Sequence, residues 1–413
     1  MVPWLKELQK RLLDLINEGK FGDVYRVIHE GRIYALKSEG RDISDSRLKT
    51  EVLVYKSIEE ESYRNPQLTA HFLRMLDRGL DSEIKYVVIS YYEQNLVDVR
   101  LRLKREFSYS TALRVCIQLC EAVDDLHKLG FVHCESLIFY KHSFPYLKPQ
   151  HFVVGRFHDR NLIYLVDFEL AVRDEATADP KTNRISSYKT LRYVSRRIHK
   201  GISKPTVVDD YESLIYVCLE AFDMKILPWS HLTFKNVNEM VKSKENFFHH
   251  QYPEVYIVCP PEFKQIVNLV NTPNTTVKIP KLLEILHAIR IRKRIDLFAL
   301  YEWEALGSLD SQTIVQLRTT QMTNEAIGAL NIKQKRSAQR LITAKSESNE
   351  AKEKQKSLGA TAVELNSKDE IIEETPIRFS HSVVSEQRSN DTRSITSKSL
   401  QNEIVHDLRS FRK

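Results

Sequence analysis

The sequence of 413 residues lacks any long apolar run, which bears on membrane insertion and on secretion. No stretch approaches the roughly 20 consecutive apolar residues that a membrane-spanning helix needs. Between Lys6 and Asp14 five charged residues interrupt the apolar positions, where a secretory signal would need an unbroken apolar centre. We therefore expect no membrane association and a cytoplasmic protein, whose composition is also compatible with the nucleus.

Cysteine is scarce and shows no pairing pattern. The chain has 5 cysteines and no C-x-x-C pair, too few for a disulfide scaffold and more typical of a reducing compartment. Cys116 and Cys120 lie four residues apart on a predicted helix. This spacing suits a shared metal ion or, as we favour, two neighbouring buried thiols. The net charge of +7 is small for this length and indicates no nucleic-acid partner.

Aromatic residues are nearly absent from the last part of the chain. Only Trp303, Phe379 and Phe411 follow Tyr301, and Ser, Thr, Gln, Glu and Lys dominate there. Such a segment cannot offset its ordering entropy by burying apolar surface. We therefore predict one folded domain over residues 1–302 and a mostly disordered, Ser/Thr-rich tail over residues 303–413.

The predicted domain changes character near residue 92. Before that point short β-rich runs surround one helical stretch at 48–58, whereas the following sequence is mainly helical, as at 110–129. This order predicts an α+β fold of two unequal lobes. A β-rich N-lobe would cover about 1–90, and a mainly α-helical C-lobe about 93–302.

A glycine-containing turn between two predicted strands is the first candidate for ligand binding. Gly19 and Gly22 fit two positions of a phosphate-covering loop, and Asn17 stands where its first glycine would be. Further on, Lys37 lies on an apolar strand and Glu51 near the start of an amphipathic helix. A lysine that binds phosphates needs such an acid to orient it. On these residues alone, a plain hairpin and two solvated side chains remain the alternative.

The second lobe carries an acid directly after an apolar strand. Asp167 follows the run LIYLV, a position from which its carboxylate could bind Mg²⁺. Upstream, the stretches DLHKLGFVHC at 125–134 and LKPQHFVVG at 147–155 read as two halves of a catalytic loop. With the dipeptide Asp167-Phe168, these stretches indicate phosphoryl-transfer machinery.

These motifs resemble those of the protein kinase superfamily, within it the casein kinase I group, and within that group the tau-tubulin kinase branch. The group's own signatures are matched downstream by TLRYVS at 190–195, His199 with Gly201, DDYESLIYV at 209–217 and LPW at 227–229. The likeness runs in order from about Leu12 to Leu300. It implies a bilobal protein-kinase fold in which His133 and Asp210 brace the metal-binding segment and the catalytic loop.

The resemblance also implies which residues form the site. Nucleotide would be bound by Gly19, Gly22, Val24, Ala35, Lys37, Glu51, Ile89, Tyr92 and Val153. Among these, the glycines would cover the phosphates, Lys37 would pair with Glu51, and Ile89 would be the gatekeeper beside the adenine. Asp167 would hold the metal ion, and Lys148 would be a catalytic residue that reaches the γ-phosphate.

The departures from the family pattern fall on the reaction centre. Glu135 stands where the catalytic aspartate belongs, with one methylene more. A displacement of about 1 Å can cost on the order of a hundredfold in rate. Residues 136–146 then read as an insertion, or as a segment retained at a splice junction. Without a gap, Tyr146 would take the base position, and a phenol cannot accept a proton near neutral pH.

Two further departures concern the metal and the phosphates. His151 replaces the asparagine that would bind a second Mg²⁺, and a neutral imidazole suits that oxygen-seeking cation poorly. Glu169 replaces the glycine after Phe168, and its carboxylate would repel nucleotide phosphates unless a cation intervenes. The expected cofactors are therefore ATP and a single Mg²⁺ ion.

The sequence thus predicts a kinase domain of casein kinase I type that binds ATP and phosphorylates protein serine or threonine weakly or not at all, a pseudokinase. Two alternatives stay open: an active Ser/Thr kinase with Glu135 as base, and a scaffold that binds partners without nucleotide. We expect a protein substrate or binding partner. Arg192, Arg196 and Arg197 would suit one that is acidic or phosphorylated.

Overall fold

A computed structural model describes most of the first 306 residues. The described ranges are 12–18, 22–44, 46–80, 82–92, 94–133, 146–174, 191–200, 205–272 and 278–306. The chain divides into two compact units, 1–332 and 333–413, and every described residue belongs to the first. The predicted tail therefore lies outside the described residues, apart from its first four positions.

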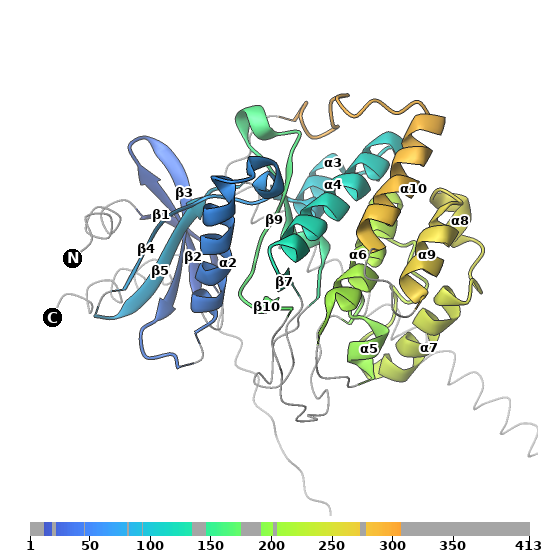
Figure 1. Cartoon of the computed structure of the whole chain (residues 1–413), viewed down its shortest axis with the longest axis horizontal. Coiled ribbons are helices and arrows are strands. Elements are labelled where there is room, and N and C mark those ends of the chain that lie inside the picture. The colour runs from blue at the N-terminus through green and yellow to red at the C-terminus, as the bar shows by residue number, and fades with distance from the viewer. Residues whose placement is uncertain are drawn as a thin grey trace, which may run out of the picture. The chain divides into compact units, whose positions relative to one another are not determined.

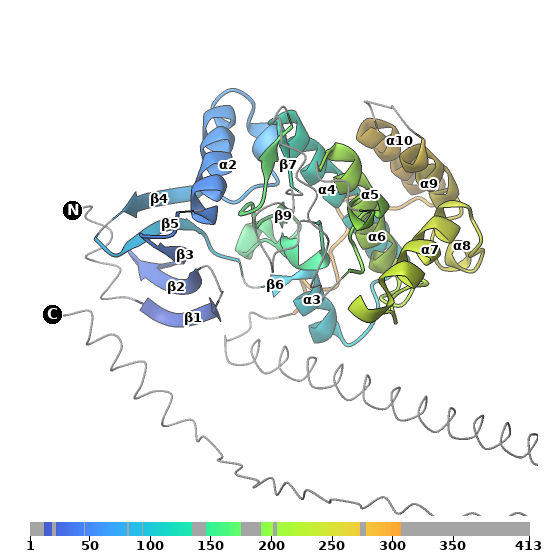
Figure 2. The ribbon, with the colours of Figure 1, turned by 90° about the horizontal axis from the view of Figure 1, so that it is seen from below.

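The described residues between 12 and 90 form a five-stranded antiparallel sheet with one helix along its face (Figures 1 and 2). The strands are β1 (Leu12–Glu18), β2 (Asp23–His29), β3 (Arg32–Gly40), β4 (Met75–Leu80) and β5 (Ile84–Ser90). Their order in the sheet is β1-β2-β3-β5-β4. The helix α2 (Arg47–Ser62) begins after Ser46, whose side chain accepts a hydrogen bond from the backbone N–H of Lys49 at 3.2 Å. Such a cap satisfies an otherwise unpaired helical N–H group.

The two faces of β3 serve different parts of the core. Successive side chains of a strand point to opposite faces. Leu36 joins a small cluster with Val27, Tyr86 and Val88, whereas Ala35 belongs to the large core that continues into the helical part. Lys37 is two residues from Ala35 and therefore lies on the face that looks toward α2. This alternation positions the lysine for the site described below.

The described residues after 93 are mainly helical. The helices are α3 (Leu96–Leu103), α4 (Tyr109–Lys128), α5 (Arg196–His199), α6 (Val207–Phe222), α7 (Val237–Phe248), α8 (Val255–Val258), α9 (Phe263–Asn271) and α10 (Lys278–Arg292). Helix α4 packs beside α6 and α10 (Figure 1). Cys116 and Cys120 on α4 are buried, and the Cys116 thiol donates to the Cys218 carbonyl at 3.4 Å. Among the described residues no group of three His, Cys, Asp or Glu side chains is placed to hold a metal ion.

Short strands and turns lie between the sheet and the helices (Figure 2). Strands β6 (Gln94–Asn95), β8 (Phe152–Val154) and β9 (Ile163–Leu165) form one small sheet, and β7 (Phe131–Val132) pairs with β10 (Val172–Arg173). Four 3₁₀ turns are η1 (Pro66–Thr69), η2 (Pro149–His151), η3 (Phe157–Asp159) and η4 (Phe234–Asn236). Strand β9 leads directly into Asp167. This mixed architecture, a β-rich part followed by a helical part, is compatible with a protein-kinase fold.

The packed core continues past the predicted boundary at residue 302. Trp303 is 4% exposed, its ring stacks on that of Tyr301 at 4.2 Å, and its indole N–H donates to the Arg160 carbonyl at 2.8 Å. Leu306 also packs against the core. The folded part therefore reaches at least residue 306, because one aromatic that the composition placed in the tail completes a buried ring pair.

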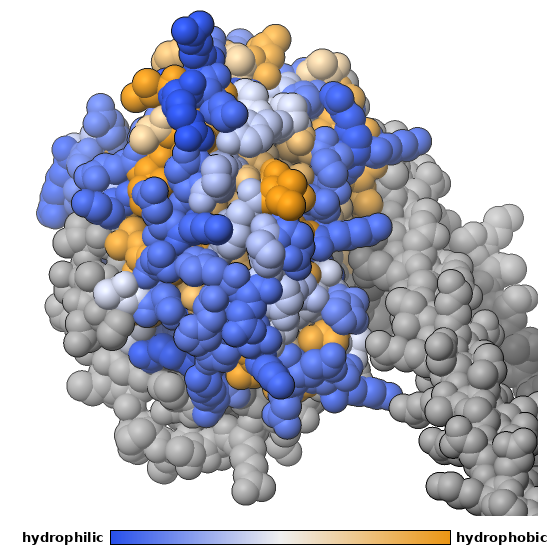
Figure 3. All heavy atoms as spheres, turned by 90° about the vertical axis from the view of Figure 1, so that its right-hand side faces the viewer, coloured by the Kyte–Doolittle hydropathy of each residue, from blue (hydrophilic) through white to orange (hydrophobic). Residues whose placement is uncertain are grey.

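The surface over α7 to α10 is predominantly hydrophilic, with small hydrophobic spots separated by polar side chains (Figure 3). Exposed apolar side chains in this part of the chain include Ile257, Ile291 and Phe298. Scattered apolar residues of this kind are normal on a protein surface. No helix within the described ranges has the length and apolar character needed to cross a bilayer.

Candidate functional site

The centre of the candidate site is an ion pair between β3 and α2. The Lys37 ammonium lies 2.6 Å from Oε2 of Glu51, whose side chain is 1% exposed. The other oxygen, Oε1, is buried without a hydrogen-bond partner among the described residues. Removing either partner of such a buried ion pair strongly destabilises the fold, because the other charge is then buried without compensation.

Two more carboxylates converge on the same ammonium. Glu169 Oε1 lies 2.8 Å and Asp167 Oδ1 3.6 Å from the Lys37 nitrogen. Burial alone would lower the pKa of Lys37, but Glu169, Glu51 and Asp167 together raise it well above its usual value. Burial raises the pKa of Glu51 to about 7; Lys37 opposes this rise, while Glu169 and Asp167 add to it. The arrangement thus contains more negative than positive charge.

Asp167 adopts a backbone conformation that is rare for a residue with a side chain. Its φ of 71° lies in the left-handed region, where strain is found mainly at functional sites. The carboxylate is 43% exposed, so oxygen lone pairs remain accessible. Burial alone would raise the pKa of Asp167, but Lys37, His151 and Lys148 hold this pKa well below its usual value. This carboxylate is therefore ionised at neutral pH.

The next residue, Phe168, packs its ring against side chains from three other segments. Its fully buried ring meets Tyr55 of α2 at 5.5 Å and Phe72 at 6.0 Å, in edge-to-face geometry. The ring of His133 lies 6.0 Å from that of Phe168, also in edge-to-face geometry. Tyr55 was not singled out from the sequence, although it lies four residues after Glu51 and hence on the same face of the helix.

His133 and Asp210 make the bracing contacts that the sequence predicts. The His133 ring nitrogen Nε2 lies 3.2 Å from the carbonyl oxygen of Val166, the residue before Asp167. Its backbone N–H donates to Oδ2 of Asp210 at 2.8 Å, and the same oxygen lies 2.8 Å from Nε2 of His127. Helix α6 therefore fixes the end of β7 through one buried carboxylate.

His151 lies beside the acid that would hold the metal. Its Nε2 is 3.5 Å from Oδ2 of Asp167, and its ring lies 4.8 Å from that of His133. Burial lowers the pKa of both histidines, that of His151 well below the usual value, so both are neutral near pH 7. A neutral imidazole at this position offers nitrogen, where Mg²⁺ prefers oxygen.

The residues expected around the adenine share one apolar cluster. Ala35 and Ile89 lie opposite each other in the β3–β5 ladder, and both are buried. Val153 on β8 is fully buried, and the half-buried Val24 and Tyr92 pack against the same core. All five therefore belong to the large core that runs through both parts of the domain, in which Ala35 and Ile89 are direct neighbours.

Several predicted residues concern the loops of the site. A side chain at Gly22 would run into the carbonyl oxygen of Ser38, so glycine is required there by the close approach of β2 to β3. Gly19, Glu135 and residues 136–145 lie outside the described residues. Tyr146 is buried and its ring stacks on Tyr193 at 6.2 Å, which makes it a packing residue of that region.

The arginines expected to meet an acidic partner are paired inside the domain. Arg192 donates to Glu220 at 3.0 Å and Arg196 to Glu212 at 3.2 Å, while Arg197 lies 3.4 Å from a carboxylate of α6. The sequence did not anticipate these internal partners, because they lie on a helix more than ten residues further along the chain.

A fully buried lysine holds the same region in place. The Lys244 ammonium of α7 donates to the carbonyl oxygens of Leu191 at 2.9 Å and Val194 at 2.6 Å, and lies 3.1 Å from Nε2 of His199. Burial lowers the pKa of Lys244 well below its usual value, and it lowers the pKa of His199 to about 3, with Lys244 adding to that effect. His199, known from the sequence only as part of a family signature, is thus a neutral acceptor.

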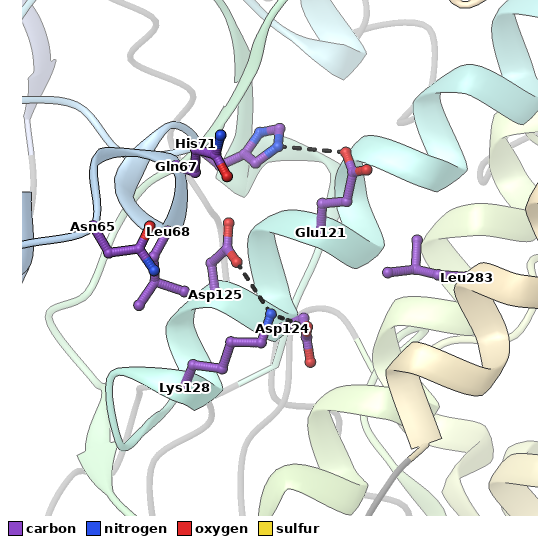
Figure 4. Close-up of a pocket in the computed structure, with 9 residues that line it drawn as sticks. All are labelled: Asn65, Gln67, Leu68, His71, Glu121, Asp124, Asp125, Lys128 and Leu283. Atoms are coloured by element: carbon purple, nitrogen blue, oxygen red, sulfur yellow. Dashed lines mark ion pairs between the residues drawn. The ribbon is translucent and has the colours of Figure 1, made fainter.

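A polar pocket of about 560 Å³ lies where the segment around η1 meets α4 (Figure 4). Glu121 lies 3.5 Å from Nε2 of His71, and Lys128 lies 2.6 Å from Asp124 and 3.7 Å from Asp125. The other ring nitrogen of His71 lies 2.8 Å from the Ile163 carbonyl on β9. These internal pairs connect α4 to the strand that presents Asp167.

Three relatives of the chain are named as serine/threonine-protein kinases. No family model matches the chain. Over 269 residues it is 28% identical to a Dictyostelium discoideum protein named as a probable serine/threonine-protein kinase, which covers 63% of this chain and 48% of that protein. Two Caenorhabditis elegans proteins named as candidate serine/threonine-protein kinases are 29% identical over 209 residues and 27% identical over 229 residues.

These alignments cover only part of this chain and of each relative. The two Caenorhabditis elegans alignments cover 48% and 53% of this chain, and 58% and 54% of those proteins. The chain thus spans about half the length of the curated relatives it matches. The likenesses support placing the matched part of the chain in the protein kinase superfamily, whose members in general use ATP and Mg²⁺.

Proposed function

We propose that this chain contains a protein-kinase domain of the casein kinase I group, in its tau-tubulin kinase branch. It binds ATP with one Mg²⁺ ion and phosphorylates protein serine or threonine weakly or not at all. The observation that carries the proposal is the convergence of Glu51 and Asp167 on the Lys37 ammonium, at 2.6 Å and 3.6 Å. A strand lysine, a helix glutamate and a metal-binding aspartate are the parts that hold nucleotide in kinases.

The residues present fit one nucleotide with one metal ion. Lys37 would hold phosphate oxygens, and the ionised, accessible carboxylate of Asp167 would hold Mg²⁺. The apolar cluster around Ala35, Ile89 and Val153 would receive the adenine. When bound, Mg²⁺ neutralises charge on the phosphates. The neutral, buried His151 offers a second ion no oxygen ligand.

We expect this site to transfer a phosphoryl group less efficiently than it binds nucleotide. The family's catalytic aspartate is replaced by Glu135, and a general base typically contributes about 10²–10⁴ in rate. Binding depends on Lys37, Glu51 and Asp167, which are all present, and so should survive better than turnover. A kinase that uses Glu135 as base and a nucleotide-independent scaffold are the two alternatives that the experiments below separate.

A thermal-shift titration of the full chain with Mg-ATP tests binding. We expect the unfolding midpoint of the wild type to rise with nucleotide, because a ligand that binds only the folded state stabilises it. Lys37→Ala should abolish the rise, whereas Lys49→Ala, which removes an exposed lysine on α2, should leave it unchanged. A wild type that does not respond to any adenine nucleotide would reject nucleotide binding and favour the scaffold.

Transfer of labelled phosphate to protein or peptide acceptors tests turnover. We expect a rate at least about a hundredfold below that of an intact kinase, from the loss of the properly placed base. Asp167→Asn identifies which signal comes from this chain, because it removes the metal-binding charge. Vigorous transfer that Asp167→Asn abolishes would overturn the pseudokinase assignment and establish an active kinase.

A further inference from the structure

Glu169 makes a contact with Lys37 that the family pattern does not contain. Its carboxylate lies 2.8 Å from the Lys37 ammonium, nearer than Asp167 at 3.6 Å. The position directly after Phe168 belongs to a glycine in the family pattern, which has no side chain to offer. The contact therefore arises from this chain's own sequence.

We propose that Glu169 is an internal competitor of nucleotide phosphate, whose carboxylate occupies the place on Lys37 that a phosphate oxygen of ATP would take. This inference rests on the proposed function, because it concerns the same ammonium. A phosphate oxygen of a di- or triphosphate gains the donor that Glu169 holds only when Glu169 leaves Lys37. The site is thereby biased toward adenine ligands that carry less negative charge.

The donor count of the ammonium supports this competition. A lysine ammonium has three N–H donors and no acceptor. Three carboxylates, those of Glu51, Glu169 and Asp167, surround it within 2.6–3.6 Å. Glu51 and Glu169 lie at hydrogen-bonding distance and take two of the three donors, so at most one donor remains for phosphate oxygens unless a carboxylate moves away.

Burial decides which carboxylate moves. Glu51 is 1% exposed and fixed on α2, so it cannot reach water without unfolding the helix contact. Asp167 is held through the buried ring of Phe168 and is needed for the metal. Glu169 is 29% exposed and can turn into solvent by side-chain rotation alone. The competition therefore operates through Glu169.

Whether removal of the Glu169 charge strengthens or weakens the binding of ATP distinguishes this role from metal binding. If Glu169 repels phosphates, removing its charge strengthens the binding of ATP with or without Mg²⁺. If Glu169 were instead a second metal ligand, removing its charge would weaken the binding of Mg-ATP. Adenosine, which carries no phosphate, should be insensitive to Glu169 in either case.

Isothermal titration of the full chain with ATP in EDTA, with Mg-ATP and with adenosine tests the proposal. Glu169→Gln keeps the side-chain length and removes only the charge, and Glu169→Gly supplies the family residue if the first variant does not fold. We expect ATP to bind about tenfold or more tightly to Glu169→Gln than to the wild type, as expected for removal of a nearby like charge. Adenosine affinity should stay within about twofold.

A matched control and the contrary outcomes complete the test. Glu59→Gln removes an exposed carboxylate from α2 and should leave all three affinities unchanged. Equal ATP affinity in wild type and Glu169→Gln, or weaker Mg-ATP binding in the variant, would overturn the competition while leaving nucleotide binding intact. If neither protein binds ATP or adenosine, the proposed function itself fails, and this inference with it.

Discussion

At the scale of single residues, Lys37 determines the charge balance of the site. One ammonium, 13% exposed, faces three carboxylates, of which only Glu51 is fully withdrawn from water. The sequence was sufficient to predict the Lys37–Glu51 pair and the nearby Asp167. It identified Glu169 as a charge that would repel phosphates but did not predict its contact with Lys37, because the family pattern has a glycine there and offers no partner for a side chain.

Removing Lys37 should destabilise the fold as well as the site. Lys37→Met leaves Glu51 buried opposite an apolar side chain, and breaking a buried ion pair costs about 3–5 kcal/mol. The double variant Lys37→Met with Glu51→Leu replaces both charges by apolar groups and should recover most of that free energy of unfolding. Urea denaturation measures both. A double variant no more stable than the single one would contradict the buried pair as described.

His199 should make stability depend on pH in a defined direction. Its pKa is lowered to about 3 in the folded chain, whereas the unfolded chain has an ordinary histidine. The unfolded state therefore binds the additional proton, and the free energy of unfolding falls as the pH drops below about 6.5. His199→Gln keeps a side-chain acceptor for Lys244 but does not titrate.

Denaturation at several pH values checks this expectation. Between about pH 6.5 and pH 4.5, the wild type should lose about 2 kcal/mol of stability relative to His199→Gln. Parallel pH profiles for the two proteins would show that His199 is not a buried neutral acceptor.

At the scale of elements, Phe168 connects helix α2 to the segment after strand β9 that carries Asp167. Its ring contacts Tyr55, Phe72 and His133, from three separate segments. The sequence predicted helical stretches at 48–58 and 110–129, which correspond to α2 and α4, from their helical periodicity, and it placed Lys37 on a strand, which is β3. Strands β6 to β10 have only two or three residues each, too few for any periodic signal, and their pairing depends on tertiary contacts.

Truncating Phe168 should separate these elements. Phe168→Ala removes a fully buried ring, and such a change costs about 3–5 kcal/mol of unfolding free energy. Phe157→Ala makes the same chemical change at a ring that is 73% exposed and should cost less than about 0.5 kcal/mol. Chemical denaturation of the two variants gives the comparison, and similar losses in both would contradict the packing assigned to Phe168.

At the scale of the whole molecule, the core takes in an aromatic residue beyond the predicted domain boundary at residue 302. Composition assigned Trp303 to the tail because aromatic residues thin out there. The structure instead buries this ring against Tyr301 and Phe107. The frequency of aromatic residues along the sequence does not show that Trp303 packs against a residue as far away in the chain as Phe107.

Trp303 should therefore contribute to the stability of the full chain. Trp303→Ala removes a buried aromatic ring and the hydrogen bond to the Arg160 carbonyl, and should cost about 3–5 kcal/mol. Phe298→Ala, at a ring that is 90% exposed, should change stability by less than about 0.5 kcal/mol. Thermal or urea unfolding of full-length variants measures both. An unfolding free energy unaffected by Trp303→Ala would contradict the packing assigned to this ring.

The most direct test follows ATP by ³¹P nuclear magnetic resonance in one sample of full-length protein, Mg²⁺ and an acceptor peptide. We expect the phosphate resonances to broaden or shift with the wild type and to remain sharp with Lys37→Ala, while ATP persists and ADP accumulates slowly or not at all. Unperturbed resonances in the wild-type sample would contradict nucleotide binding. Rapid conversion to ADP and phosphopeptide, lost in Asp167→Asn, would contradict a site that binds ATP but has given up efficient transfer.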